Sequence, residues 1–196
     1  MTAIGATLVH TGLKLIAANG FEATSVDEIT TAAGVAKGTF YNYFKTKEDL
    51  ALAGVAQAQA EMVTRVEALI AAHPATRDRL QRLFDEIVTW VVANPEPAWI
   101  WGLEQLRRGR SDAYGASGVS QALIRIIEAG QAAGDVRTDR PSMLLSLELE
   151  GLFLAYLAAW KHRGRGRPFD LAEMMRLAVD DLLDGIGAGP LPRETR

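Results

Sequence analysis

The chain of 196 residues contains no cysteine, which excludes disulfide bonds and thiolate zinc sites. Such a composition is typical of proteins that work in the reducing cytoplasm. The three histidines, His10, His73 and His162, are scattered along the chain without the spacing of a metal site. We therefore expect a cytoplasmic protein with no bound metal and no cofactor.

Long hydrophobic runs are also missing. No uninterrupted apolar stretch reaches the roughly 18 residues that a membrane-spanning helix needs. The N-terminus has neither the basic start nor the cleavable apolar stretch of a signal peptide. These observations predict a protein that is not attached to a membrane.

Catalytic motifs are equally scarce. Ser117 lies in Gly-Ala-Ser-Gly, which misses the Gly-x-Ser-x-Gly pattern of hydrolases by one position. Asp180, Asp181 and Asp184 are more typical of a solvated helical face than of a magnesium cluster. The basic run at 161–167 is more typical of a loop between helices than of a nucleic-acid site. We therefore expect no enzymatic activity.

Helical periodicity is what the sequence does contain. Apolar residues recur at helical spacing along most of the chain, whereas strand-like alternation and internal repeats are not evident. The sequence therefore predicts an all-α fold. We expect a small N-terminal unit over residues 1–50 and a larger helical domain over residues 51–196.

The segment from Ser25 to Lys47 is the most informative stretch. Ser25 and Glu28 form a capping box at the start of a short helix, and Gly34 then supplies a tight turn. A second short helix follows from about residue 36 to 44, and Thr46 begins a third. Two short helices joined by a glycine turn are the geometry of a helix-turn-helix, whose second helix enters the DNA major groove.

Spacing alone is equally compatible with a small helical core that binds nothing. The side chains favour DNA binding, because burying Phe40 and Phe44 leaves Tyr41 and Tyr43 facing outward. Exposed tyrosines are costly on an unused surface, whereas a phenol can donate a hydrogen bond to a phosphate while its ring packs on sugar.

This segment resembles the recognition region of TetR-family transcriptional repressors. The resemblance rests on residues 32–50, Ala-Ala-Gly-Val-Ala-Lys-Gly-Thr-Phe-Tyr-Asn-Tyr-Phe-Lys-Thr-Lys-Glu-Asp-Leu, and on residues 19–29, Asn-Gly-Phe-Glu-Ala-Thr-Ser-Val-Asp-Glu-Ile. It implies that some side chains approach base edges or nearby phosphates, namely Lys37, Gly38, Thr39 and Asn42. It implies that others hold the DNA backbone, namely Ser25, Tyr41, Tyr43 and Lys47.

Two departures from the family pattern affect the expected binding. Ala36 replaces the usual serine, so the recognition helix lacks a cap worth about 0.5–2 kcal/mol. The first 50 residues carry four lysines but five carboxylates. Sequence-independent attraction to phosphate should therefore be weak. An alternative is that the chain is a small helical enzyme or ligand-binding protein whose DNA binding is weak or lost.

The last two expected helices, residues 141–160 and 170–185, favour assembly. The first is apolar on nearly every face, so it must be buried on nearly every face. The family resemblance implies a homodimer through a four-helix contact built from these two helices. The expected interface residues are Leu149, Gly151, Leu152, Met174, Met175, Ala178 and Leu182. A purely internal core helix is the alternative.

A regulatory ligand should bind among the middle helices. The expected pocket residues are large or acidic side chains in apolar helices, namely Trp90, Trp99, Trp101, Glu104, Met143, Glu148, Phe153, Tyr156 and Trp160. Each aromatic taken alone is more often core than ligand contact, and each glutamate is more often part of an ion pair. The sequence as a whole predicts a ligand-responsive homodimeric repressor that binds a palindromic operator in double-stranded DNA, with recognition helices about 34 Å apart, and is released by a small, partly hydrophobic effector.

Overall fold

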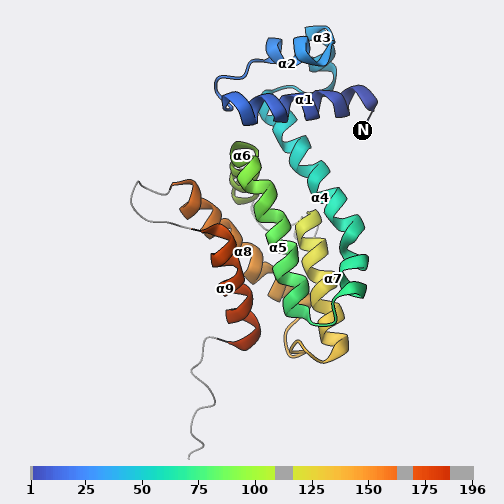
Figure 1. The fold of residues 1–196 in the computed structure, drawn as a ribbon, viewed down its shortest axis with the longest axis vertical. Helices are drawn as coiled ribbons and strands as arrows, with labels where there is room; N and C mark the ends of the chain where they lie inside the picture. Colours follow the sequence, from blue (N-terminus) through green and yellow to red (C-terminus); the bar gives the residue numbers. More distant parts are fainter. Residues whose placement is uncertain (1, 109–116, 163–169, 186–196) are drawn as a thin grey trace, which may run out of the picture.

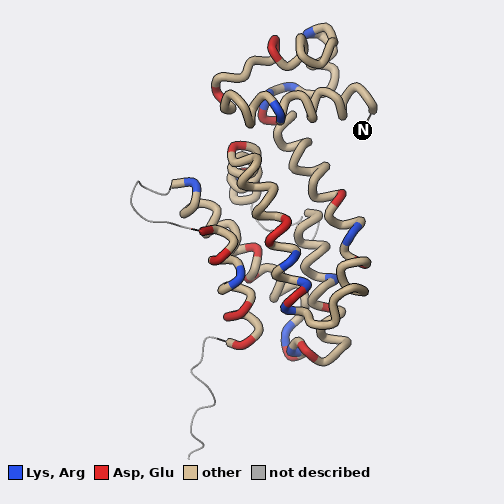
Figure 2. The backbone as a smooth tube through the Cα atoms, in the orientation of Figure 1, with Lys and Arg blue, Asp and Glu red and all other residues tan. Residues whose placement is uncertain are grey.

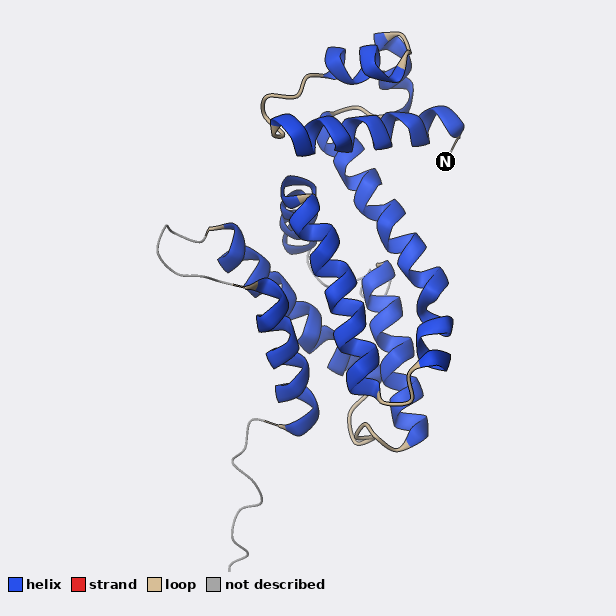
Figure 3. Cartoon of the chain, viewed as in Figure 1, coloured by secondary structure: helices blue, strands red, loops and turns tan. Residues whose placement is uncertain are grey.

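The computed structural model describes residues 2–108, 117–162 and 170–185 (Figure 1). Within these residues every regular element is a helix (Figure 3). The helices are α1 (Ala3–Asn19), α2 (Val26–Ala33), α3 (Lys37–Tyr43), α4 (Lys47–Ala72), α5 (Thr76–Ala93), α6 (Pro95–Arg108), α7 (Gly118–Ala133), α8 (Ser142–Lys161) and α9 (Leu171–Asp184). The all-α prediction is confirmed.

Local signals set the bounds of the first helices. The Ser25 hydroxyl accepts from the Glu28 amide at 3.2 Å, and the Glu28 carboxylate accepts from the Ser25 amide at 2.7 Å. Gly34 ends α2 in the left-handed conformation, with φ of 70°, which glycine adopts without a Cβ penalty. Ala36 precedes α3 without a side-chain cap, as its sequence predicts. Thr46 and Asp49 form a second capping box at the start of α4.

A small hydrophobic core holds α1, α2 and α3 on the first turns of α4. Leu8, Ile29, Phe40 and Leu50 are completely buried at its centre. We call this group and its buried neighbours the N-terminal core; the neighbours are Val9, Ile16, Phe21, Phe44 and Ala51. The core places α3 at one end of the molecule, away from α5, α7 and α9 (Figure 1).

Two glycines let α1 cross closely over α4. A Cβ at Gly12 would lie 2.7 Å from the Leu50 side chain, and one at Gly54 would lie 2.6 Å from the Leu13 side chain. Both distances are too short for a real contact, so a larger residue at either position would force the facing leucine side chain to shift. The crossing fixes α1 on the same long helix that continues into the rest of the protein.

The second and larger core lies among α4 to α9. Its most deeply buried side chains include Leu80, Leu123, Ile126, Leu149 and Met175. Helix α8 supplies one complete wall through Leu145, Leu149, Phe153 and Leu157, which recur every four residues.

Helix α8 is the one helix in the described part of the chain that is long and apolar enough to cross a membrane, with a mean hydropathy of 1.5. The sequence expectation missed it because Glu148 and Glu150 interrupt every continuous apolar run, whereas a window average tolerates them. Both carboxylates have protein partners: Arg140 binds Glu148 at 3.0 Å, and the Ser120 hydroxyl donates to Glu150 at 2.6 Å. Core helices of soluble proteins pass the same test, so this is weak evidence for a membrane span.

Candidate DNA-binding surface and ligand cavity

Helix α3 presents one face to the N-terminal core and the other to solvent. Phe40 is completely buried, and its ring packs against Phe44 with centroids 5.7 Å apart. The neighbouring Tyr41 and Tyr43 remain 51% and 37% exposed. Asn42 is also exposed, so three consecutive hydrogen-bonding side chains lie on the outer end of the molecule.

Gly38 has no packing role that explains it. A Cβ at this position would meet no atom within 4 Å, and its φ is not positive. Thr39 beside it is half-buried. The bare backbone at Gly38 leaves α3 open to close approach by another molecule.

Lys37 and Ser25 already have partners within the subunit. The Lys37 ammonium lies 2.8 Å from the Asp27 carboxylate of α2, and both side chains are more than half exposed. The hydrogen bond to Asp27 raises the pKa of Lys37 above its ordinary value. Ser25 caps α2, and its two hydrogen bonds to Glu28 lower the pKa of that carboxyl. DNA would compete with both arrangements.

The structure places Lys47 differently from the sequence expectation of a phosphate contact. Its ammonium points inward and donates hydrogen bonds to the carbonyl oxygens of Phe21 and Thr24. It also lies 4.4 Å from the centroid of the Phe21 ring. Sequence spacing could not show this, because the two carbonyls are separated from Lys47 by more than twenty residues.

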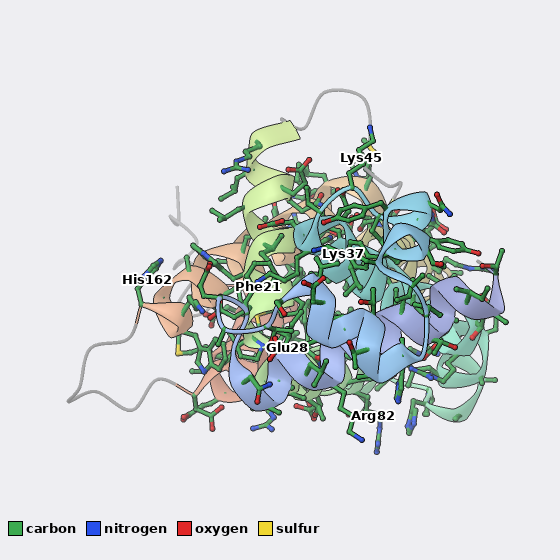
Figure 4. The ribbon with its side chains drawn as sticks, turned by 90° about the horizontal axis from the view of Figure 1, so that it is seen from above. Phe21, Glu28, Lys37, Lys45, Arg82 and His162 are labelled. Carbon is green, nitrogen blue, oxygen red and sulfur yellow. The ribbon has the colours of Figure 1, made fainter. Side chains whose placement is uncertain are left out.

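The outer end of the molecule carries charges of both signs (Figure 2). Seen from above, Lys37 and Lys45 lie on the same face as Glu28 (Figure 4). The surface therefore lacks the uniform basic charge of a non-specific DNA binder.

A cavity of about 620 Å³ lies between α4 and α5 and reaches the larger core. Most of its deep lining is apolar, namely Met62, Ile87, Trp90, Val91, Ala98, Trp101, Val119, Phe153 and Leu157. Its rim is polar, namely His10, Gln57, Gln59, Glu61, Arg65, Glu86 and Thr89. An ion pair between Arg65 of α4 and Glu86 of α5 bridges the two helices beside it.

Three of the nine expected pocket residues line this cavity, namely Trp90, Trp101 and Phe153. The other six do not line it, namely Trp99, Glu104, Met143, Glu148, Tyr156 and Trp160. Trp99 instead packs edge-on against His162, with the two ring centroids 5.0 Å apart. Met143 lies at the start of α8 and is 53% exposed. Glu148 pairs with Arg140.

No sequence pattern indicated that α4 and α1 contribute to the cavity. Periodicity identifies the inward side of a helix, but it does not show whether that side meets packed side chains or a hollow. The wall includes Val9, His10 and Leu13 of α1, so the cavity reaches the helix that carries the N-terminal core.

The outer sides of α8 and α9 expose apolar residues. Met143, Leu144 and Leu177 are 53%, 40% and 49% exposed. Of the expected interface residues, Leu149, Met175 and Ala178 are buried within the subunit, so they cannot reach a partner without repacking. The others are half-buried, namely Gly151, Leu152, Met174 and Leu182.

Two further expectations concern charged residues near the C-terminus. Asp180 and Asp184 are not simply solvated, because both accept hydrogen bonds from Arg77 of α5. Lys161 pairs with Glu96 of α6. The rest of the basic run, residues 163–167, lies outside the described residues.

Comparison with known proteins identifies the helix-turn-helix. Residues 8–53 match the family model of bacterial regulatory proteins of the tetR family. These residues therefore form a DNA-binding domain of the TetR type. The match covers α1, α2, α3 and the first turns of α4, which are the elements joined by the N-terminal core.

Full-length relatives extend the likeness beyond this domain. The chain is 22% identical to the fatty acid metabolism regulator protein of Bacillus subtilis, over 91% of this chain and 93% of that protein. Its fold is similar to that of Thermus thermophilus FadR, a TetR-family repressor solved with lauroyl-CoA. That likeness has a TM-score of 0.75 at 24% identity and covers 98% of this chain and 100% of the other.

A second solved structure is similar over nearly the same length. FadR from Bacillus subtilis in complex with stearoyl-CoA gives a TM-score of 0.69 at 22% identity, over 93% of this chain and 99% of that chain. The chain therefore combines a tetR-family helix-turn-helix with the fold of these two regulators.

Proposed function

We propose that this regulator represses transcription by placing α3 of each subunit in the major groove of a palindromic operator. The exposed hydroxyls and amide of Tyr41, Asn42 and Tyr43 supply the contacts, with Lys37, Thr39 and the bare backbone at Gly38 approaching the bases. Ser25 approaches the DNA backbone at the start of α2. The protein acts on DNA in the cytoplasm and has no enzymatic activity of its own.

The proposed division of labour follows the two hydrophobic cores. Residues 1–50 read DNA around the N-terminal core, and residues 51–196 bind the ligand and the partner subunit around the larger core. Helix α4 belongs to both, because Leu50 lies in one core and Val66 in the other. Movement of this helix therefore affects both functions.

The partner subunit covers the exposed apolar side of α8 and α9. Leu144 and Leu177 are exposed apolar side chains that a partner would bury, and Gly151 allows close approach at mid-helix. Leu152 and Met174 border this side and gain burial from the partner, as does Leu182. Only 28% of the most apolar window of α8 is buried in one subunit, which leaves the remainder for a second copy.

The proposed effector carries a long acyl chain, and acyl-CoA thioesters are the first candidates. The apolar interior and polar rim of the cavity suit a molecule with a hydrocarbon tail and a polar head. Its volume of about 620 Å³ falls within the range of ligand pockets. The relatives solved with lauroyl-CoA and stearoyl-CoA support the same class of ligand.

Release from DNA follows from the shape of the cavity. Leu13 of α1 lies over Gly54 of α4, and both residues line the cavity. A ligand that reaches this crossing must displace one helix relative to the other, and α1 carries the N-terminal core. The ligand binds the displaced state better and shifts the population away from the DNA-bound state.

The single observation that supports this function most strongly is the exposure of Tyr41 and Tyr43 on a helix-turn-helix that α4 connects to an apolar cavity. The test is to isolate genomic fragments bound by the purified protein and to measure their retardation with and without lauroyl-CoA. We expect wild type to retard at least one fragment and lauroyl-CoA to release it. Tyr41→Ala should abolish retardation while the protein stays folded and dimeric.

A second candidate function is ligand binding without DNA binding. The mixed charge of the outer end, the uncapped start of α3 and the engagement of Lys37 by Asp27 favour it. Failure of every genomic fragment to bind at low salt, together with tight binding of lauroyl-CoA, would support this second function and reject the first.

A further inference from the structure

An ion pair joins the first turns of α2 and α3 at the outer end of the molecule. The Lys37 ammonium lies 2.8 Å from the Asp27 carboxylate, and the two side chains are 56% and 67% exposed. Lys37 is the first residue of α3 and the only charged residue in the sequence of that helix. The charge on the recognition helix is therefore matched by a charge of opposite sign from the helix before it.

Neither helix depends on this ion pair for its own position. Ser25 and Glu28 already form the capping box of α2, and Phe40 holds α3 on the N-terminal core. Exposed ion pairs contribute little to folding, because water screens both charges. A cation at the start of a helix is also unfavourable, since the free amides there attract anions. The main effect of the pair therefore falls on a molecule that binds this surface.

The Asp27 carboxylate opposes the sequence-independent attraction of Lys37 to DNA. A lysine that contacts a phosphate releases a counterion, which makes binding depend on salt. A carboxylate 2.8 Å from that lysine offsets its positive charge and repels the phosphate directly. Residues 1–50 as a whole already carry four lysines against five carboxylates. A phosphate contact by Lys37 is therefore disfavoured on DNA of any sequence.

A guanine edge in the major groove suits the paired lysine better than a phosphate does. The Lys37 ammonium has three donors, of which the hydrogen bond to Asp27 uses one. Guanine presents two adjacent acceptors, N7 and O6, which match the two remaining donors. Adenine has a donor amine in place of O6, and neither pyrimidine presents two adjacent acceptors. The carboxylate thus leaves Lys37 with donors that only guanine satisfies fully.

We propose that Asp27 is a positioning residue that sets DNA specificity through Lys37, keeping this lysine from phosphates and directing it to a guanine in each operator half-site. This inference rests on the proposed function, because it assigns the ion pair a part in reading the operator. It predicts that removing the Asp27 charge tightens binding to unrelated DNA and weakens discrimination in favour of the operator.

The first test compares Asp27→Asn with the matched control Glu22→Gln, which removes an exposed carboxylate between α1 and α2. Affinities are measured over a range of salt for a retained genomic fragment and for a random-sequence duplex of the same length. In Asp27→Asn the slope of log affinity against log salt on the random duplex should steepen by about 0.9 per subunit, the contribution of one phosphate contact. The ratio of specific to random affinity should fall about fivefold or more, the size of one lost base contact. Glu22→Gln and the charge-retaining Asp27→Glu should keep both wild-type values.

The second test repeats Asp27→Asn in a Lys37→Met background. If Asp27 acts through Lys37, the double variant should have the same salt slope and the same affinity ratio as Lys37→Met alone. Persistence of the full Asp27→Asn effect without the lysine would mean that the carboxylate acts on DNA directly or at long range. That result would overturn the proposal. Circular dichroism checks that each variant remains folded.

The third test locates the guanine by methylation interference, in which a methyl group on N7 blocks one of the two acceptors. We expect methylation of one guanine in each half-site to weaken wild-type binding and to have no effect on Lys37→Met. Interference should be smaller in Asp27→Asn than in wild type. Interference that is the same in Lys37→Met as in wild type, or absent from both, would reject the guanine contact.

The outcomes separate this inference from the proposed function. If wild type retains a genomic fragment but Asp27→Asn has the wild-type slope and ratio, the inference fails and the proposed function stands. If wild type retains no fragment at low salt, the proposed function fails and the reading of guanine fails with it. The random duplex still decides in that case whether Asp27 keeps Lys37 from phosphates.

Discussion

The start and the middle of α4 are packed differently. Around Leu50, short helices with strong local caps pack on a small core whose central side chains are completely buried. Around Met62, longer helices surround a cavity of about 620 Å³. The difference follows from the function of each part. A DNA-binding surface has to keep a fixed shape, whereas a ligand site has to keep an open volume and to change conformation when the ligand binds.

The largest expected effect separates the two cores. Phe40→Ala removes a completely buried ring from the N-terminal core and should cost about 3–5 kcal/mol of stability there. DNA binding should be lost, while the larger core and its ligand binding persist. Denaturant unfolding followed by tryptophan fluorescence reports only the larger core, because Trp90, Trp99, Trp101 and Trp160 all lie outside residues 1–50. A fluorescence transition shifted as far as the loss of helicity would contradict this independence.

The next effect concerns the partner subunit. Leu177→Glu places a charge on the exposed apolar side of α9 and should weaken dimerisation by about 2 kcal/mol or more. Leu106→Glu is the control, because Leu106 is 66% exposed and belongs to α6 and not to α8 or α9. Light scattering over a range of concentrations measures the outcome. A Leu177→Glu dimer as tight as wild type would exclude α9 from the interface.

The cavity can be filled from either end. Val119→Phe adds volume on the α7 wall of the cavity and should weaken lauroyl-CoA binding at least tenfold with little effect on DNA binding, because Val119 belongs to α7 and not to α1. His10→Trp adds volume beside α1 and should weaken DNA binding even without ligand. Calorimetry and DNA retardation measure the two affinities. Equal effects of both variants on DNA would mean that filling the cavity anywhere is sufficient.

A smaller effect sharpens the contrast in local order. Ala36→Ser supplies the missing cap of α3 and should stabilise the N-terminal part by about 0.5–2 kcal/mol. Tighter DNA binding should accompany this gain, because less ordering is then needed on contact. Unchanged DNA affinity in a stabilised variant would show that α3 is already ordered before it binds.

The smallest effect is the acid response of the α2 cap. Hydrogen bonds from Ser25 lower the pKa of Glu28 below its ordinary value. A lowered pKa means that the charged carboxylate favours the folded state, so its contribution is present above that value and is lost as pH falls through the folded pKa. Glu28→Gln keeps an acceptor but removes the charge, and should flatten this part of the pH dependence of unfolding. An unchanged profile would assign the acid response to other carboxyls.

The helix-turn-helix was the part best predicted from sequence. The bounds of α2 and α3, the Ser25–Glu28 box and the turn at Gly34 all follow from contacts within a few residues. For the ligand site, three of the nine expected residues line the cavity. Large aromatic side chains are equally suited to filling a core, so residue type alone does not locate a hollow.

The amino-acid sequence by itself determined the family, the helical class and the outward side of α3, because these depend on local caps, turns and periodicity. The tertiary structure alone decided that Lys47 holds the Phe21–Thr24 turn, that Leu149 and Met175 face the subunit's own core, and that the cavity reaches α1. Each of these depends on residues brought together from distant parts of the chain. Such contacts are selected by the packing of whole helices, which no local pattern encodes.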